Sequence, residues 1–248
     1  MAQAGSQRLD QRLVADGLVA SRARALDLVK RGFVRVDGNV CVRPAQLVTA
    51  YAVISLAENT PGFVSRGAEK LAAALDYFGF EPRGRVALDA GASTGGFTEV
   101  LLQRGAGRVY AVDVGRGQLH ERLRDDKRVV SLEEQDIRLL DRGLIPEPIG
   151  AIVADVSFIS LTKALPVALE LAAPDAFLVA LIKPQFELTP GDIGKGGIVR
   201  DEAARARAVD SVRAFVAGVS GWRVLGVIES PITGGSGNIE YLLGACRT

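Results

Sequence analysis

The chain has 248 residues, of which 48% are hydrophobic, and its 30 Lys and Arg residues balance 29 Asp and Glu residues. A chain of this length and composition can bury a substantial core in one or two domains. Its single histidine and its two distant cysteines exclude a disulfide framework and a Cys/His metal site, so no metal is expected. Two prolines and two acidic residues interrupt the longest apolar region, residues 164–182, and the first residues lack a signal-peptide pattern. We therefore expect a cytoplasmic protein with no membrane span.

Basic charge is concentrated near the N-terminus. Residues 1–57 carry eight Lys and Arg against four Asp and Glu, whereas the remainder carries 22 against 25. Apolar spacing predicts a helix over residues 8–17 and a second helix with Ser21 as its N-cap. Residues 33–36 and 39–42 are typical of two strands around an Asp-Gly turn, and residues 53–56 of a third strand. A small α+β module is thus expected over residues 1–59.

Four segments of this module form a specific combination: Arg8-Leu-Asp-Gln-Arg-Leu13, Ser21-Arg-Ala-Arg24, Val29-Lys-Arg-Gly-Phe-Val34 and Val36-Asp-Gly-Asn39. Together they resemble the αL-type RNA-binding module found in a small-subunit ribosomal protein and in pseudouridine synthases. Composition alone favours a solvated basic surface. The resemblance implies instead that basic residues contact RNA phosphates. Such contacts hold RNA without reading its sequence. The predicted RNA contacts are Arg8, Arg12, Arg22, Arg24, Lys30, Arg31 and Arg35.

Residues 60–64 are expected to be a linker, and residues 65–248 to form a second domain. A helix capped by Ser65 is predicted to open this domain. It would place Arg66 and Lys70 on one helix face, either as a simple surface pair or, for Arg66, as a further RNA contact.

The second domain is organised around Arg85-Val-Ala-Leu-Asp-Ala-Gly-Ala-Ser-Thr-Gly-Gly-Phe-Thr98. The apolar run ending in Asp89 predicts a buried parallel strand, the small residues a tight turn, and Phe97 a helix start. A cofactor can lie against such a backbone and face the free amides of the helix start, although similar turns also occur without a ligand. Ser93 replaces the second glycine of the dinucleotide fingerprint, which favours a compact ligand without phosphates, such as S-adenosylmethionine.

Strands and helices alternate through the rest of the chain. Strands are predicted at residues 108–113, 129–132, 151–155, 176–182, 222–229 and 239–245, and helices at 97–104, 118–124, 161–171 and 201–217. Residues 183–200 are interpreted as a mobile lid or a plain flexible loop, and they lack the glycine and the Ser/Thr that a Walker A loop needs. The predicted fold is α/β, a Rossmann-like methyltransferase sheet with a terminal antiparallel hairpin.

Four ionisable residues are expected at the carboxyl ends of strands, where open α/β sheets bind ligands: Asp89, Asp113, Asp155 and Lys183. Asp113 follows Gly91 by twenty-two positions, which suits a carboxylate that holds a ribose diol. A structural salt bridge is the competing interpretation for each of them.

Six blocks spread over the chain carry a closer resemblance: Val64-Ser-Arg-Gly-Ala-Glu-Lys-Leu71, Leu88-Asp-Ala-Gly-Ala-Ser-Thr-Gly-Gly-Phe-Thr98, Val112-Asp-Val-Gly-Arg-Gly-Gln-Leu119, Ala154-Asp-Val-Ser-Phe-Ile-Ser160, Leu181-Ile-Lys-Pro-Gln-Phe-Glu187 and Gly237-Asn-Ile-Glu-Tyr241. They resemble the TlyA family of so-called hemolysins, RNA ribose 2′-O-methyltransferases related to the FtsJ methyltransferase. Arg116 departs from the family pattern, where an aromatic residue is usual, and residues 60–63 replace a more polar segment.

The resemblance implies S-adenosylmethionine as cofactor and ribosomal RNA, on ribosomal subunits, as partner, with cytidine riboses as targets. It implies a catalytic tetrad of Lys70, Asp155, Lys183 and Glu240. The residues predicted to bind the cofactor are Asp89, Gly91, Ala92, Ser93, Thr94, Gly95, Gly96, Phe97, Asp113, Val114, Asp136 and Ile137.

These residue types suit the chemistry. Methyl transfer from a sulfonium is an in-line displacement, in which the enzyme orients a hydroxyl and helps to remove its proton. Lys183 could act as the base if the nearby charge of Lys70 favours the neutral form of the Lys183 amine. Alternatively, a charged Lys183 stabilises the developing alkoxide and the proton passes to a carboxylate.

Other function classes lack their motifs. Asp155-Val-Ser-Phe158 is not the Asp/Asn-Pro-Pro-aromatic turn of methyltransferases that act on exocyclic amines, and neither cysteine lies near that strand end. A non-catalytic RNA-binding or assembly factor stays open, although the full tetrad argues against it. The word hemolysin suggests a pore-former. The sequence has neither the membrane segment nor the long basic amphipathic helix that a pore-former needs.

Overall fold

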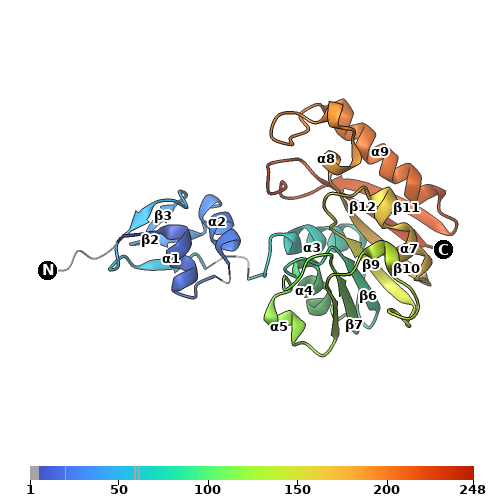
Figure 1. The fold of residues 1–248 in the computed structure, drawn as a ribbon, viewed down its shortest axis with the longest axis horizontal. Coiled ribbons are helices and arrows are strands. Elements are labelled where there is room, and N and C mark those ends of the chain that lie inside the picture. Colours follow the sequence, from blue (N-terminus) through green and yellow to red (C-terminus); the bar gives the residue numbers. More distant parts are fainter. Residues whose placement is uncertain (1–5, 20, 59, 61) are drawn as a thin grey trace. The chain divides into compact units, whose positions relative to one another are not determined.

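The computed structural model describes residues 6–248 except 20, 59 and 61. The chain divides into two compact units, Met1–Val64 and Ser65–Thr248 (Figure 1). The exact extent of the expected linker over residues 60–64 stays a prediction.

The first unit packs two helices against a small antiparallel sheet. The helices are α1 (Leu9–Ala15) and α2 (Arg22–Lys30), and the sheet has the order β3-β2-β5, with β2 (Val34–Val36), β3 (Asn39–Cys41) and β5 (Ile54–Leu56). The Ser21 hydroxyl caps α2 by accepting a hydrogen bond from the Arg24 amide at 3.2 Å, as predicted. Asp37 and Gly38 both have positive φ angles, 51° and 79°, as the predicted two-residue hairpin turn requires. A pair of two-residue strands, β1 (Gln7–Arg8) and β4 (Leu47–Val48), was not predicted because strands this short carry no hydrophobic period.

The second unit contains a seven-stranded sheet in the order β11-β12-β10-β9-β6-β7-β8. Its strands are β6 (Val86–Ala90), β7 (Arg108–Val112), β8 (Val129–Leu132), β9 (Ile149–Ala154), β10 (Ala172–Ile182), β11 (Trp222–Glu229) and β12 (Tyr241–Arg247). Strand β12 runs antiparallel to both of its neighbours, β10 and β11, while the other pairs are parallel. The predicted Rossmann-like sheet with a terminal antiparallel hairpin, preceded by a small α+β module, is confirmed.

Helices cover both faces of this sheet (Figure 1). On one face, α6 (Leu161–Ala164), α7 (Pro166–Glu170) and α9 (Glu202–Gly218) share a buried core with alternate residues of the strands. On the other face, α3 (Gly67–Phe78) and α4 (Gly96–Gln103) pack together, and Phe78 lies so close to Gly244 of β12 that a Cβ there would lie 2.6 Å from the ring. Short elements complete the unit: α5 (Glu121–Arg124), α8 (Pro184–Glu187) and the 3₁₀ turns η1 (Ile137–Leu139) and η2 (Pro190–Asp192).

Three helix predictions were wrong in detail. Helix α3 begins at Gly67 without a side-chain cap, because Ser65 instead packs its hydroxyl against Gly96, where a Cβ would lie 2.1 Å from it. The helix expected over residues 161–171 is broken into α6 and α7, because Pro166 has no amide hydrogen to continue the first helix. Of residues 118–124, only Glu121–Arg124 are helical.

No helix in the described part of the chain combines the length and apolarity needed to cross a membrane.

Candidate active site

Two adjoining cavities open at the carboxyl ends of β6, β7, β9 and β10. The larger has a volume of about 990 Å³ and the smaller about 270 Å³. Gly91, Ser93, Asp155 and Ser157 line both of them. This is the edge where an open α/β sheet binds its ligands, as the sequence predicted.

The first of two lysine–carboxylate pairs lines the smaller cavity. Asp155 follows β9 and Lys183 follows β10, and these neighbouring parallel strands bring the two side chains together. Lys183 Nζ lies 2.6 Å from Asp155 Oδ1 and donates a hydrogen bond to Ser157 Oγ at 2.9 Å. The Lys183 and Asp155 side chains are 12% and 22% exposed, so the pair is open to a substrate in the cavity.

The second pair is more deeply buried. Lys70 of α3 and Glu240, directly before β12, place Nζ and Oε2 2.5 Å apart, with side chains 7% and 3% exposed. Lys70 lines the smaller cavity, whereas Glu240 packs behind it against Gly234, where a Cβ would lie 2.3 Å from Glu240 Oε1. The structure thus assembles the four predicted residues into two ion pairs, three of whose members face the cavity. Their catalytic roles stay predictions.

The turn after β6 has the close approach that the glycines predicted. Gly91 has a φ angle of 82°, and a Cβ at this position would lie 2.7 Å from the Asp155 carbonyl oxygen. Any side chain would therefore push apart the two strand ends that form the site. Gly95 also requires glycine, because its φ angle is 97° and a Cβ there would lie 2.3 Å from Leu123 Cδ1.

The residues predicted to bind the cofactor divide between the two cavities. Gly91, Ser93, Asp113, Val114, Asp136 and Ile137 line the larger cavity, and the smaller is lined by Gly91, Ala92, Ser93, Thr94, Gly96 and Phe97. Asp89 and Gly95 are not among the lining residues of either cavity.

Asp113 is fixed by the backbone around it. Its carboxylate accepts hydrogen bonds from the Ser93 amide at 2.8 Å and the Gly115 amide at 2.7 Å. A carboxylate oxygen has more than one acceptor site, so these bonds leave capacity for the hydroxyls of a ligand. Glu133, which the sequence analysis missed, accepts from the Gly117, Gln118 and Leu119 amides and thereby shapes the same loop. Those backbone hydrogen bonds lower the pKa of Glu133.

Asp89 is a buried support behind the turn. It accepts a hydrogen bond from Thr98 Oγ1 at 2.6 Å, which ties β6 to α4. Its Oδ1 has no hydrogen-bond partner among the residues that the structure describes. Burial raises the pKa of Asp89 to about 7, the Thr98 hydrogen bond acts against this shift, and the Asp155 charge adds to it. Asp136 differs: it pairs with Arg138, whose hydrogen bonds lower the pKa of Asp136.

The sequence analysis also missed an aromatic pair at the larger cavity. Phe158 and Phe186 both line it, with ring centroids 5.0 Å apart. Phe158 is 91% exposed and has a φ angle of 65°, which bulky side chains rarely adopt. Both residues stand in the sequence blocks around Asp155 and Lys183, but neither carries an ionisable group that would single it out.

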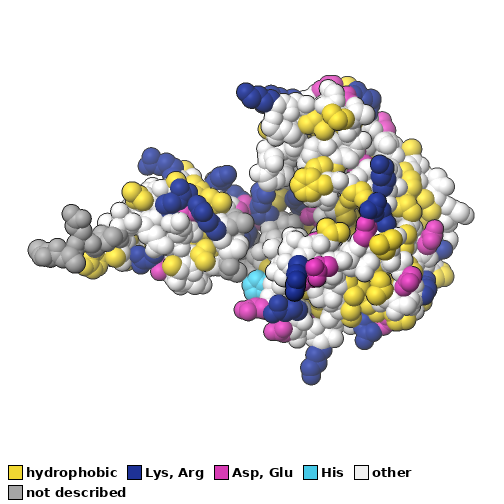
Figure 2. Space-filling model, viewed as in Figure 1, with side chains coloured by type: hydrophobic (Ala, Val, Ile, Leu, Met, Phe, Trp, Pro, Cys, Tyr) yellow, Lys and Arg dark blue, Asp and Glu magenta, His cyan; other side chains and the backbone are white. Residues whose placement is uncertain are grey.

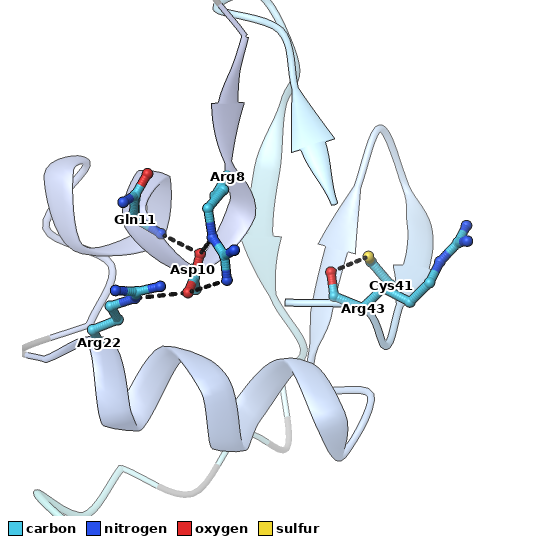
Figure 3. A network of polar contacts seen from close by, with 6 residues as sticks. All are labelled: Arg8, Asp10, Gln11, Arg22, Cys41 and Arg43. Carbon is cyan, nitrogen blue, oxygen red and sulfur yellow. Dashed lines mark hydrogen bonds and ion pairs between the residues drawn. The ribbon is translucent and has the colours of Figure 1, made fainter. Parts of the chain in front are cut away.

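The predicted RNA contacts of the first unit include two arginines that share one carboxylate (Figure 3). Buried Asp10 accepts from Arg8 Nε at 3.0 Å, Arg22 Nε at 2.8 Å and the Gln11 amide at 3.1 Å. The two Arg8 hydrogen bonds, followed by the single one of Arg22, hold the pKa of Asp10 at about 2 against the opposing effect of burial. Both guanidiniums still reach solvent, because their side chains are 40% and 54% exposed.

The other predicted RNA contacts differ in exposure. Lys30 and Arg35 are exposed, whereas the Arg24 side chain is 8% exposed and pairs with Asp27. Arg12 pairs with Asp16 at 2.7 Å, and Arg31 lies over the Phe33 ring at 5.0 Å. Figure 2 shows Lys and Arg side chains on the surface of this unit. Arg66 belongs to the second unit, where it lines the smaller cavity.

Sequence comparisons match both units to known families. Residues 63–247 match the model of the FtsJ-like methyltransferases, and residues 7–54 match the S4 domain. The chain is 50% identical over 243 residues to the 16S/23S rRNA (cytidine-2′-O)-methyltransferase TlyA of Mycobacterium tuberculosis, which covers 95% of this chain and 88% of that protein.

Structural comparisons agree. A structure from Streptococcus thermophilus that is described as a hemolysin superposes with a TM-score of 0.78 at 37% identity, over 99% of this chain and 90% of that one. The O-methyltransferase from Bacillus cereus in complex with SAH has a TM-score of 0.53 at 17% identity, over 77% of this chain and 85% of that one. At that identity, the second likeness concerns the fold alone.

Proposed function

The chain belongs to the TlyA family of FtsJ-like methyltransferases, and from this premise we propose that it transfers a methyl group from S-adenosylmethionine to the 2′-hydroxyl of a cytidine ribose in ribosomal RNA. The observation that carries the proposal is the pairing of Lys183 with Asp155 and of Lys70 with Glu240 beside a cavity of cofactor size.

The larger cavity fits S-adenosylmethionine. Its volume of about 990 Å³ lies in the range of pockets for small molecules and cofactors. Asp113 offers carboxylate oxygens to a ribose diol, and Val114 and Ile137 offer an apolar wall to an adenine. Gly91 lines both cavities and lets the ends of β6 and β9 approach closely enough to form the site. When bound, the cofactor supplies a methyl group activated by a sulfonium.

The smaller cavity then receives the ribose. Of the two roles open to Lys183, its ion pair with Asp155 favours the charged one, in which the ammonium stabilises the oxygen that develops negative charge. Asp155 is the adjacent group able to accept the hydroxyl proton. Lys70, held from behind by Glu240, adds a second positive charge to the cavity wall.

RNA is held by two kinds of contact in this proposal. The exposed arginines and lysine of the first unit contact phosphates, and such contacts hold RNA without reading its sequence. The exposed Phe158 ring, backed by Phe186, offers a stacking surface for an unstacked base at the cavity mouth.

The proposal is tested by incubating the pure protein with methyl-labelled S-adenosylmethionine and unmodified ribosomal subunits, then digesting the RNA to nucleosides. The expected product is labelled 2′-O-methylcytidine at one or a few positions. Label on a base instead of the ribose would overturn the proposal. RNA binding without any transfer would also overturn it and would favour an assembly factor that keeps the fold.

A further inference from the structure

Two short segments that follow neighbouring strands are joined at both of their ends. The first, residues 155–161, follows β9, and the second, residues 183–187, follows β10. At their N-terminal ends, Lys183 contacts Asp155 and Ser157, as described above. These contacts belong to the catalytic pair.

The C-terminal ends are joined by Glu187, which has no role in the chemistry proposed so far. Its Oε2 accepts a hydrogen bond from the Ser160 hydroxyl at 2.5 Å, and its Oε1 accepts from the Leu161 amide at 2.9 Å. One carboxylate therefore uses both of its oxygens to hold the first segment. Burial raises the pKa of Glu187, against the effect of these two hydrogen bonds. The Ser160 hydroxyl also accepts from the Thr162 amide at 3.2 Å, so Ser160 itself caps α6 and the carboxylate is additional to that cap.

Between these two junctions lies Phe158, with its left-handed backbone and exposed ring. A bulky residue keeps a positive φ angle only where the surrounding structure imposes it. The contacts that can impose it flank Phe158 on either side: Lys183 with Asp155 and Ser157 before it, and Glu187 with Ser160 and Leu161 after it. Since Phe186 directly precedes Glu187, the same helix α8 carries the clamp and the ring that faces Phe158.

We propose that Glu187 is a positioning residue: its carboxylate clamps the Phe158 turn in the strained conformation that holds the Phe158 ring against Phe186 at the mouth of the active site. The expected effect of Glu187 on the reaction rate rests on the proposed methyl transfer, whereas the clamp itself is a property of the folded chain. It differs from a purely stabilising contact because its effect passes through the backbone of Phe158.

The principal test compares Glu187→Leu with Glu187→Gln in the full-length protein. Leucine removes both hydrogen bonds, whereas glutamine can keep both, because its carbonyl oxygen accepts from the Leu161 amide and its amide nitrogen donates to the Ser160 oxygen. We expect Glu187→Leu to lower the single-turnover rate of methyl transfer about tenfold or more, with cofactor affinity within about twofold of wild type. Glu187→Gln should restore most of the rate. Glu170→Gln, at an exposed position on α7, is the matched control.

Two results would overturn the proposal. A Glu187→Leu enzyme as fast as the Glu170→Gln control would show that the clamp does not matter. A Glu187→Gln enzyme as slow as Glu187→Leu would show that the charge of Glu187, and not its hydrogen bonds, is what the reaction needs.

A second comparison asks whether the effect passes through Phe158. Phe158→Gly removes the ring and should therefore slow the enzyme by itself. Because glycine adopts a positive φ angle without strain, this variant should no longer need the Glu187 hydrogen bonds to hold the turn. Adding Glu187→Leu to Phe158→Gly should then change the rate by less than about twofold. Equal effects of Glu187→Leu in both backgrounds would assign Glu187 a general structural role and refute the positioning role.

A third measurement does not depend on activity. Amide hydrogen exchange in a peptide spanning residues 156–161 should be faster in Glu187→Leu than in wild type, with Glu187→Gln close to wild type. Unchanged exchange in Glu187→Leu would refute the clamp even if the protein methylates no RNA. Conversely, faster exchange together with an inactive wild-type protein would refute the proposed function and leave the clamp standing. If Glu187→Leu does not fold, Ser160→Ala removes the Oε2 partner together with the Ser160 cap of α6. Unchanged exchange in that variant would refute the clamp.

Discussion

Replacing Glu240 with glutamine should destabilise the protein strongly, because it removes one partner of a buried ion pair. The Lys70 and Glu240 side chains are 7% and 3% exposed, with Nζ and Oε2 2.5 Å apart. In Glu240→Gln the ammonium remains without a compensating charge, which typically costs about 3–5 kcal/mol. In a domain of this size, each kcal/mol lowers Tm by about 2–4 °C, so a decrease of roughly 6–20 °C is expected.

Thermal unfolding followed by circular dichroism measures this directly, with Glu229→Gln at an exposed strand end as the control. The double variant Lys70→Met, Glu240→Leu removes both charges and should recover most of the lost stability, because apolar replacement of a whole buried pair is often neutral. It should still be inactive, since Lys70 faces the smaller cavity. A Glu240→Gln protein whose Tm lies within about 2 °C of the control would refute this reasoning.

Three further predictions concern the cofactor and the first unit. Asp113→Ala should weaken S-adenosylmethionine binding by about 1–3 kcal/mol through the loss of charge-assisted hydrogen bonds, and calorimetry showing unchanged affinity in a folded variant would contradict the assignment. The Arg8 and Arg22 hydrogen bonds lower the pKa of Asp10 from 3.8 to about 2, so their stabilisation is present above about pH 4 and is lost as the pH falls from there to about 2. At pH 7 the free energy of unfolding of Asp10→Asn should therefore be about 1–2 kcal/mol lower than that of wild type, a figure that allows for the half-exposed guanidiniums. Urea unfolding that shows the same difference at pH 2 would contradict this explanation. Deletion of residues 1–59 should leave a folded, cofactor-binding domain with most RNA affinity lost, and equal affinity at the same salt concentration would reject that division of roles.

Much of the fold could be predicted because its strands carry strong local signals. The strands β6, β7, β9 and β10 are mostly apolar, and a polar residue follows β7, β9 and β10 directly, at Asp113, Asp155 and Lys183. Asp89 was predicted to end its strand but lies within β6, one residue before the strand ends. Helix boundaries were predicted less well, because tertiary contacts override local preference. Ser65 has the chemistry of an N-cap but packs its hydroxyl against Gly96, which lies thirty-one residues later in the chain.

The pairing within the site could not be read from the sequence. Lys70 and Glu240 are separated by 170 positions, and they meet only because α3 packs beside β12. Periodicity does not reveal such a contact. Phe158 and Glu187 were missed for a related reason: their importance comes from a positive φ angle and from hydrogen bonds between two separate strand ends, which no local pattern encodes.

The most direct test of the proposed chemistry is the single-turnover rate of methyl transfer by Lys183→Ala, measured with its melting temperature and its affinities for S-adenosylmethionine and RNA. In the proposed mechanism Lys183 acts mainly in the transition state, so the rate should fall by at least about 10²-fold while both affinities and the fold remain close to wild type. Loss of stability and of binding together with the rate would indicate a structural ion pair with Asp155. A stable Lys183→Ala protein with near-normal turnover would contradict the catalytic assignment.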